Sequence, residues 1–123
     1  MRDRRRARQA SGRLAETLAG WWLRCKGYRI LAHNWKTPMG EIDLIARRGN
    51  LIAVVEVKHR PTEDAGLNAI RPKQRERIER AALAFLGRMP GVADLSIRFD
   101  VMLVTPYRPL RHLQDAWRPE KSR

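Results

Sequence analysis

Residues 40–60 read GEIDLIARRGNLIAVVEVKHR and contain two runs of apolar, often β-branched residues, 42–46 and 51–57. Each run has the length of a β-strand and is rich in the residues that strands favour. The dipeptide Gly49-Asn50 between the runs is a common signal for a two-residue hairpin turn. This stretch therefore predicts a tight β-hairpin in which the residues that flank the turn lie opposite each other.

The predicted register brings charged side chains together inside an apolar segment. Counted outward from the turn, Asp43 lies opposite Glu56, and Glu41 lies opposite Lys58 by the same count. Opposed side chains share one face of a sheet, with Cβ atoms roughly 5 Å apart. Opposed like charges destabilise a sheet, and a divalent cation that takes carboxylate oxygens would remove that repulsion. The alternative is a solvated face with a weak ion pair between Glu56 and Lys58.

The composition of the chain favours a polyanionic partner. The 123 residues, of which 43% are hydrophobic, match a single domain with a modest core. Lys and Arg number 26 against 13 acidic residues, a net charge of +13, and 21 of the 26 are Arg. Guanidinium groups bind phosphates in a bidentate geometry, and an excess of this size favours a nucleic-acid partner. A positive net charge of this size, taken alone, is also typical of a ribosomal or other RNA-binding protein.

Several classes of protein are excluded or disfavoured. Cys25 is the only cysteine, which excludes an internal disulfide and a cysteine-based zinc site. No apolar run has the length of a transmembrane helix. The segment after the Arg-rich N-terminus contains Arg13 and Glu16, unlike the apolar core of a signal peptide. We therefore expect a cytoplasmic protein without a membrane partner, and a basic amphipathic helix at a membrane surface is the less favoured alternative.

The N-terminal part of the chain predicts a basic arm followed by a helix. Residues 1–10 contain five Arg and no apolar periodicity, which predicts a flexible arm. Ser11 can cap a helix that runs to about Lys26, with Gly27 just past its end. An apolar stripe recurs along this helix at helical spacing: Leu14, Leu18, Trp21, Trp22 and Cys25.

The middle of the chain predicts a strand, a loop and a second helix around the hairpin. Residues 28–34 read as a strand, and residues 36–40 read as a loop that leads into the hairpin. Residues 59–71 lack a clean period and predict a mobile loop. Pro72 suits the first turn of a helix that runs to about Arg88. The buried stripe of this helix is expected to be Ile78, Ala81, Ala82, Phe85 and Leu86.

The overall pattern predicts one α/β domain over residues 11–117 with a short tail, 118–123. Residues 95–105 alternate as a strand, and residues 110–117 read as a short helix or strand. The strand at 95–105 follows a helix, so we expect it to pair parallel to an earlier strand through a right-handed crossover. The order α-β-β-β-α-β then gives a mixed central sheet flanked by helices.

These motifs resemble the PD-(D/E)XK nuclease superfamily. Within it they resemble the small YraN-like family of predicted endonucleases, which is related in fold to archaeal Holliday-junction resolvases. GEIDLI followed by VEVK at this spacing is a specific signal, whereas a bare Asp…Glu-x-Lys is not. The resemblance implies a restriction-endonuclease-like core. It covers residues 10–117 and includes Gly12-x3-Glu16, Gly27-Tyr28, Asn34-Trp35, residues 40–45, residues 55–60, Lys73-Gln74 and Arg98-Phe99-Asp100-Val101.

The resemblance also implies roles for individual residues. Asp43 and Glu56 look like the carboxylates that bind the metal, Mg²⁺ or Mn²⁺. Lys58 looks like the lysine that orients or activates the attacking water and offsets charge on the phosphate. Glu16 looks like the helix carboxylate that some branches of the superfamily add to the site. Two further positions are accessory candidates: Glu41, whose role is unassigned, and Gln74, which loosely resembles a glutamine of related nucleases.

The chemistry of phosphodiester hydrolysis is consistent with these residues. A divalent metal lowers the pKa of a water and neutralises charge at the phosphate. Affinity for a nucleic-acid backbone needs cations. The candidates for that contact are Arg4, Arg5, Arg6, Lys36, Arg47, Arg48, Arg60, Lys73 and Arg75.

We therefore expect a metal-dependent endonuclease, a hydrolase that acts on DNA and has branched or structured DNA among its candidate substrates. One alternative is a non-catalytic module that binds DNA or RNA and retains the nuclease fold. Another is an RNA-binding, ribosome-associated basic protein. The sequence leaves open whether the protein is a homodimer.

Overall fold

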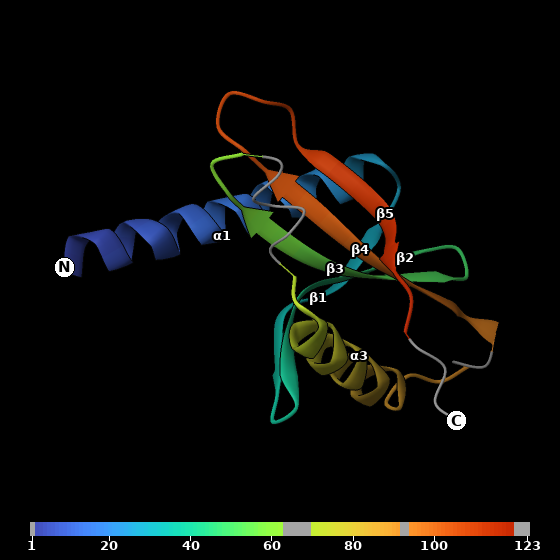
Figure 1. The fold of residues 1–123 in the computed structure, drawn as a ribbon. Helices are drawn as coiled ribbons and strands as arrows, with labels where there is room; N and C mark the ends of the chain where they lie inside the picture. Colours follow the sequence, from blue (N-terminus) through green and yellow to red (C-terminus); the bar gives the residue numbers. More distant parts are fainter. Residues whose placement is uncertain (1, 63–69, 92–93, 120–123) are drawn as a thin grey trace.

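A five-stranded mixed sheet forms the centre of the molecule, with one helix packed against each face (Figure 1). The structure is a computed structural model that describes residues 2–62, 70–91 and 94–119, with side chains from residue 12 onward. The strand order is β1-β2-β3-β4-β5, and β3 and β4 form the parallel pair. The elements are α1 (Arg2–Cys25), β1 (Arg29–Thr37), β2 (Gly40–Arg48), β3 (Leu51–His59), α3 (Pro72–Leu86), β4 (Ser96–Val104) and β5 (Arg111–Trp117).

This topology confirms the predicted α/β class and the α-β-β-β-α-β order. The chain passes from β3 through α3 to β4, which makes the expected parallel pair. The segment that the sequence left open as helix or strand is β5, which pairs antiparallel with β4. Of the loop predicted at residues 59–71, residues 63–69 lie outside the described residues, as do residues 120–123 of the tail. No helix in the described ranges is long and apolar enough to cross a membrane.

The first hairpin is longer than the sequence indicated. The predicted loop at 36–40 is mostly strand, and its turn consists of Pro38 and Met39 alone. The Thr37 hydroxyl accepts hydrogen bonds from the backbone N–H groups of Met39 and Gly40 at 3.1 and 3.0 Å, which stabilises this turn. A Cβ on Gly40 would lie 2.7 Å from the carbonyl oxygen of Arg77. The hairpin therefore packs onto α3 through backbone contact.

Helix α1 begins earlier than expected. It starts at Arg2, so the predicted flexible arm is helical over its described residues, and Ser11 is an internal residue of the helix. Arg and Ala are good helix formers, and residues 2–11 contain neither Gly nor Pro to interrupt a helix. The N-terminal part of α1 projects beyond the sheet (Figure 1).

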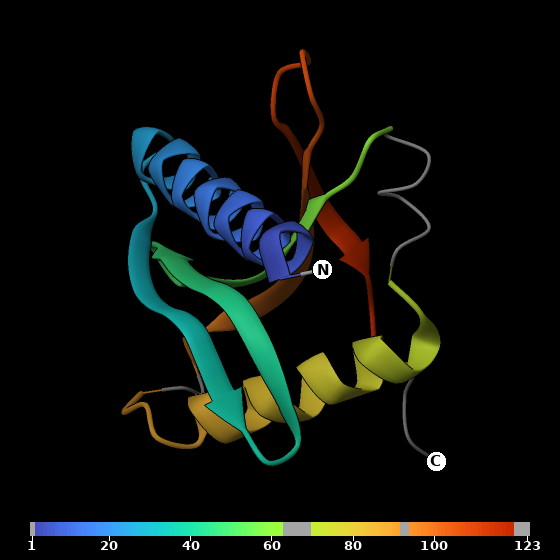
Figure 2. The same ribbon diagram turned by 90° about the vertical axis from the view of Figure 1, so that its left-hand side faces the viewer.

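The buried face of α1 is also different from the predicted one. Ala15, Ala19 and Leu23 are buried against the sheet, whereas Leu14 and Trp21 are each 59% exposed. Two alanines let the helix backbone approach the sheet closely, and this leaves the bulky apolar side chains outside. Figure 2 shows the sheet between α1 and α3. The predicted stripe of α3 is confirmed, because all its members are buried except Phe85, which is half-buried against the same core.

The predicted register of the second hairpin is confirmed from Arg48–Leu51 at the turn to Leu44–Val55. Beyond that pair the alternation of faces along β2 changes, and the expected Asp43–Glu56 and Glu41–Lys58 pairs are not part of the register. Ile42 packs in the core under α3, as does Ile45, although a strict period of two would put them on opposite faces. The change falls at residues 43–44, which places Asp43 where the two helices approach the sheet.

A buried polar network links β4 and β5 to the start of β1. Asp100 is 0% exposed and accepts hydrogen bonds from Arg98 (both 2.7 Å), His112 (2.8 Å) and the Asp115 backbone N–H (3.0 Å). Arg98 also donates to the Tyr28 hydroxyl at 2.6 Å. Burial alone would raise the pKa of Asp100, but these hydrogen bonds outweigh burial and lower it. The Arg98 and Asp100 positions of the fourth-strand motif therefore have a structural role here.

Candidate active site

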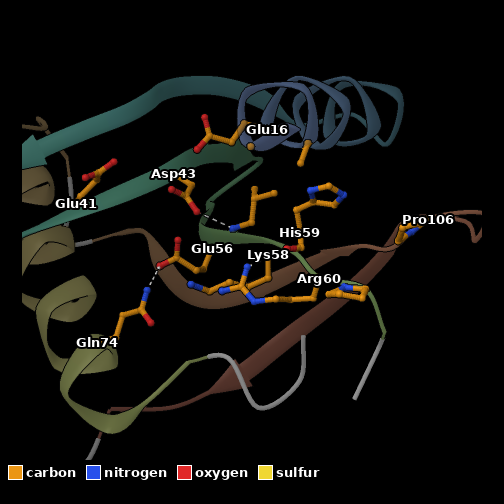
Figure 3. A pocket seen from close by; sticks show the side chains of 13 residues that line it. Glu16, Glu41, Asp43, Glu56, Lys58, His59, Arg60, Gln74 and Pro106 are labelled. Atoms are coloured by element: carbon orange, nitrogen blue, oxygen red, sulfur yellow. Dashed lines mark hydrogen bonds between the residues drawn. The ribbon is translucent and has the colours of Figure 1, made fainter. Parts of the chain in front are cut away.

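A hollow of about 980 Å³ opens between α1, α3 and the adjoining ends of β2 and β3 (Figure 3). The side chains that line it come from elements far apart in the sequence. The expected convergence of the four predicted catalytic residues is confirmed, although their catalytic role stays a prediction. Its lining includes Glu16, Asp43, Glu56 and Lys58 together with both accessory candidates, Glu41 and Gln74.

Asp43 and Glu56 form the centre of this hollow. One carboxylate oxygen of Asp43 accepts the backbone N–H of Val57 at 2.8 Å, a bond that links the two strands of the hairpin. Glu56 is only 6% exposed. Burial, a hydrogen bond with Asp43 and the charge of Asp43 raise the pKa of Glu56 to about 10, although Lys58 acts in the opposite direction. Glu56 therefore holds a proton at neutral pH when no cation is bound.

Glu16 reaches this pair from α1. Its pKa is raised by burial and by the charge of Asp43, while a hydrogen bond with the Asn34 side chain lowers it. Asn34 lies in β1 with a φ of 50°, in the left-handed region that Asn tolerates better than most residues. The raised pKa values of Glu16 and Glu56 have one cause in common, which is negative charge collected in a partly desolvated space.

Gln74 contributes a contact from the other helix. Its side-chain N–H donates to Glu56 at 3.3 Å (Figure 3). The same helix end is uncapped, because Arg71 at the N-cap makes no side-chain hydrogen bond and the first turn contains no acidic residue. Free backbone N–H groups and the helix dipole therefore add positive potential on this side of the hollow.

The predicted nucleic-acid-binding cations are distributed unevenly around the hollow. Arg60 lines it beside Lys58. Lys36 lines a neighbouring hollow, and Lys73 is exposed in the first turn of α3. The side chains of the N-terminal candidates lie outside the described residues: Arg4, Arg5 and Arg6.

Three other predicted cations are not brought to the hollow. Arg47 donates to a backbone carbonyl in the hairpin turn at 2.9 Å, at the far end of β2. The guanidinium of Arg48 lies 4.5 Å from the ring centre of Tyr28. Arg75 lies 5.8 Å from the ring centre of Trp117. None of the three side chains lines the hollow.

Other residues of the hollow were not identified from the sequence. His59 directly follows Lys58, so its nearness along the chain was an available signal. Pro106 follows β4, and it reaches the hollow because parallel strands end at the same edge of the sheet. No local pattern could have identified it. The additional lining residues are Gly12, Ala15, Val57, His59, Pro61 and Pro106.

The donor set fits an open divalent-metal site. Over residues 12–62, 70–91 and 94–119, no three His, Cys, Asp or Glu side chains are grouped so that they could hold a metal ion. Asp43 and Glu56 nevertheless offer adjacent carboxylates. Mg²⁺ is commonly held by one or two carboxylates, while waters and substrate phosphates fill its other positions.

Comparison with known proteins shows the family. The chain matches the model of "Uncharacterised protein family UPF0102" over residues 15–104. It is similar to a UPF0102 protein of Parvibaculum lavamentivorans, 58% identical over 108 residues that cover 88% of this chain and 81% of the relative. A UPF0102 protein of Paramagnetospirillum magneticum is 53% identical over 116 residues, with coverage of 91% and 90%. One of Maricaulis maris is 46% identical over 118 residues, with coverage of 96% and 93%. The chain therefore belongs to the uncharacterised protein family UPF0102, the YraN-like family that its motifs resemble.

Proposed function

We propose that the protein is a divalent-metal-dependent nuclease that hydrolyses phosphodiester bonds in DNA. The observation that carries this proposal is that four carboxylates and Lys58 line one hollow of a chain with a net charge of +13. A protein that only binds a polyanion gains nothing from carboxylates that face it, because like charges repel. When a cation lies between the carboxylates and a phosphate, it offsets their repulsion, and the carboxylates then hold the cation that binds the phosphate.

The residues of the hollow divide the chemical work. Asp43 and Glu56 would hold Mg²⁺ or Mn²⁺, which when bound lowers the pKa of a water and offsets charge at the phosphate. Lys58 supplies a positive charge in the same hollow and can orient the attacking water or bind a phosphate oxygen. Gln74 orients the carboxyl group of Glu56, and the Val57 N–H orients that of Asp43.

Metal binding at this pair is coupled to the loss of a proton. Carboxylates must be deprotonated to bind a metal. Glu56, with a pKa of about 10, holds its proton at neutral pH until a cation displaces it. Metal affinity should therefore rise with pH between about 5 and 10, and each binding event should release about one proton.

The substrate class is tested with purified protein and a panel of nucleic acids. The protein is incubated with Mg²⁺ or Mn²⁺ and linear, flapped and four-way DNA, with an RNA hairpin for comparison, and products are resolved on denaturing gels. We expect cleavage of DNA by the wild type and no detectable product with Glu56→Gln. Glu76→Gln is the matched control, because Glu76 is an exposed carboxylate on α3 that does not line the hollow.

A non-catalytic nucleic-acid-binding module is the second candidate, and the net charge of +13 favours it. The same panel separates the two functions. If the wild type binds DNA or RNA but cuts no substrate with any divalent metal, the binding module replaces the nuclease.

A further inference from the structure

Two smaller hollows adjoin the active-site hollow. One, of about 370 Å³, lies between α1 and β1 and shares Glu16 with the active site. The other, of about 510 Å³, lies between the β1–β2 turn and α3 and shares Glu41 and Gln74 with it. In Figure 3, Glu16 lies on the α1 side of the Asp43–Glu56 pair and Gln74 lies on the α3 side. The two smaller hollows therefore adjoin the active-site hollow on different sides, one toward α1 and the other toward α3.

Each smaller hollow is lined by basic residues. Arg13 and Arg24 line the one beside α1, and Lys36 and Arg77 line the one beside α3. All four side chains are exposed. Within the described part of the chain, none of them forms an ion pair with a carboxylate. Their charges are therefore available to a ligand.

Two contacts pre-position these cations. The guanidinium of Arg24 lies 5.1 Å from the ring centre of Trp21, an arrangement that favours a cation over the ring face. Arg77 lies in α3 where the backbone meets Gly40 of the first hairpin, and this contact brings Lys36 and Arg77 to one hollow. The second juxtaposition is not visible in the sequence, because Lys36 and Arg77 are far apart along the chain.

We infer that the two basic hollows bind the phosphates on either side of the phosphodiester that is cut. The strand then runs from the Arg13–Arg24 hollow, through the carboxylates, to the Lys36–Arg77 hollow. This inference rests on the proposed function. Guanidinium and ammonium groups bind phosphate, whereas the carboxylates between them accept a phosphate only through a cation. A site with phosphate-binding residues on both sides of the cut can bind a strand that continues in both directions. The substrate is therefore an internal phosphodiester bond of a polynucleotide, and cleavage is endonucleolytic.

The salt dependence of binding tests the two phosphate subsites without any need for cleavage. Binding of a short fluorescent DNA single strand is measured by anisotropy in Ca²⁺, which takes carboxylate oxygens, over a series of salt concentrations. Each lost phosphate contact lowers the log–log slope for a single strand by about 0.7. We expect that loss for Arg13→Ala and for Arg77→Ala, and no loss for Arg80→Ala, which removes an exposed Arg of α3 that lines neither hollow. Equal losses in all three variants would overturn the inference.

Neutral linkages in the substrate test the positions of the phosphates. A methylphosphonate is placed one linkage before or one linkage after the cut that the wild type makes. Each replacement should slow the wild type. Arg77→Ala should abolish the sensitivity to one replacement, and Arg13→Ala should abolish the sensitivity to the other. If both variants keep full sensitivity to both replacements, the subsites are assigned wrongly.

The outcomes separate this inference from the proposed function. A wild type that cuts no substrate, with salt slopes that respond as expected, refutes the nuclease and retains the two phosphate subsites. A wild type that cuts, with slopes that do not distinguish Arg77 from Arg80, retains the nuclease and refutes the subsites.

Discussion

The proton held by Glu56 beside Asp43 is the feature with the most consequences at the scale of single residues. Folding raises the pKa of Glu56 from 4.5 to about 10. Between these values the folded protein binds a proton that the unfolded chain does not. Stability is therefore highest below about pH 4.5 as far as this group is concerned, and it falls as the pH rises toward 10.

Glu56→Gln should remove this loss of stability, because an amide does not titrate. We expect the variant and the wild type to be similar near pH 5. At pH 9 the variant should be more stable by on the order of 1 to 3 kcal/mol. The measurement is urea unfolding in the presence of a chelator, with Glu76→Gln as the control that keeps the pH dependence of the wild type. Parallel stability curves for Glu56→Gln and the wild type would show that folding does not raise the pKa of Glu56.

Divalent metal should stabilise the folded wild type, because it binds the assembled carboxylates and not the unfolded chain. We expect Mn²⁺ to raise the melting temperature, and the rise should grow with pH, since metal binding displaces a proton. The double variant Asp43→Asn with Glu56→Gln should lose the response while it remains at least as stable as the wild type without metal. A full response in the double variant would locate the metal elsewhere.

At the scale of elements, α1 shows that large apolar residues do not always mark the buried face of a helix. Ala15 and Ala19 allow the close approach to the sheet, and Leu23 fills the remaining space. Leu23→Ala should therefore lower the free energy of unfolding by about 2–5 kcal/mol, as buried Leu→Ala changes do. Leu18→Ala, an identical change at an exposed position, should stay within about 0.5 kcal/mol. Similar losses for both variants in urea unfolding would mean that α1 packs through its other face.

The network around Asp100 joins β4 and β5 to Tyr28, the residue before β1, so its loss should be costly. Asp100→Asn leaves Arg98 with a neutral partner, and removing one member of a buried charged pair costs about 3–5 kcal/mol. Because folding lowers the pKa of Asp100, its contribution is present above the ordinary Asp pKa of about 3.9 and is lost as the pH falls below it. Asp94→Asn, at an exposed position, is the control. If both variants unfold at the same urea concentration as the wild type, the network does not stabilise the sheet.

The elements also show which parts of the fold a sequence can predict. The second hairpin and the parallel pairing of β3 with β4 follow from local patterns and chain connectivity, and both are confirmed. The first hairpin was missed because a threonine hydroxyl stabilises a turn that has no Gly at its two central positions. Arg98 and Asp100 alternate with apolar residues, which is typical of a solvated face, and only the packing of β5 buries Asp100.

Only the part of the candidate site that depends on a local sequence pattern could be predicted from the residues alone. Asp43, Glu56 and Lys58 lie on one hairpin, whose register follows from its turn as far as the Leu44–Val55 pair beside them. The approach of Glu16 depends on how α1 crosses the sheet, and the contact of Gln74 depends on where α3 begins. These are tertiary features without a local pattern. The resemblance to a nuclease family pointed to both residues.

At the scale of the whole molecule, positive and negative charge are separated in a way that matches the proposed reaction. The chain carries a net charge of +13, yet carboxylates gather in the hollow between α1 and α3. Basic hollows adjoin that centre toward both helices. A polyanion that binds the basic residues of both smaller hollows would therefore lie over carboxylates that it can approach only with a cation.

Single-turnover cleavage of one DNA substrate, followed while Mn²⁺ is varied, tests the central claim most directly. We expect the wild type to form product at a rate that saturates with Mn²⁺, and Glu76→Gln to match it. The double variant Asp43→Asn with Glu56→Gln should form none, although it still binds the DNA. Cleavage by the double variant at the wild-type rate would contradict the account, because the carboxylate pair would then have no part in the reaction.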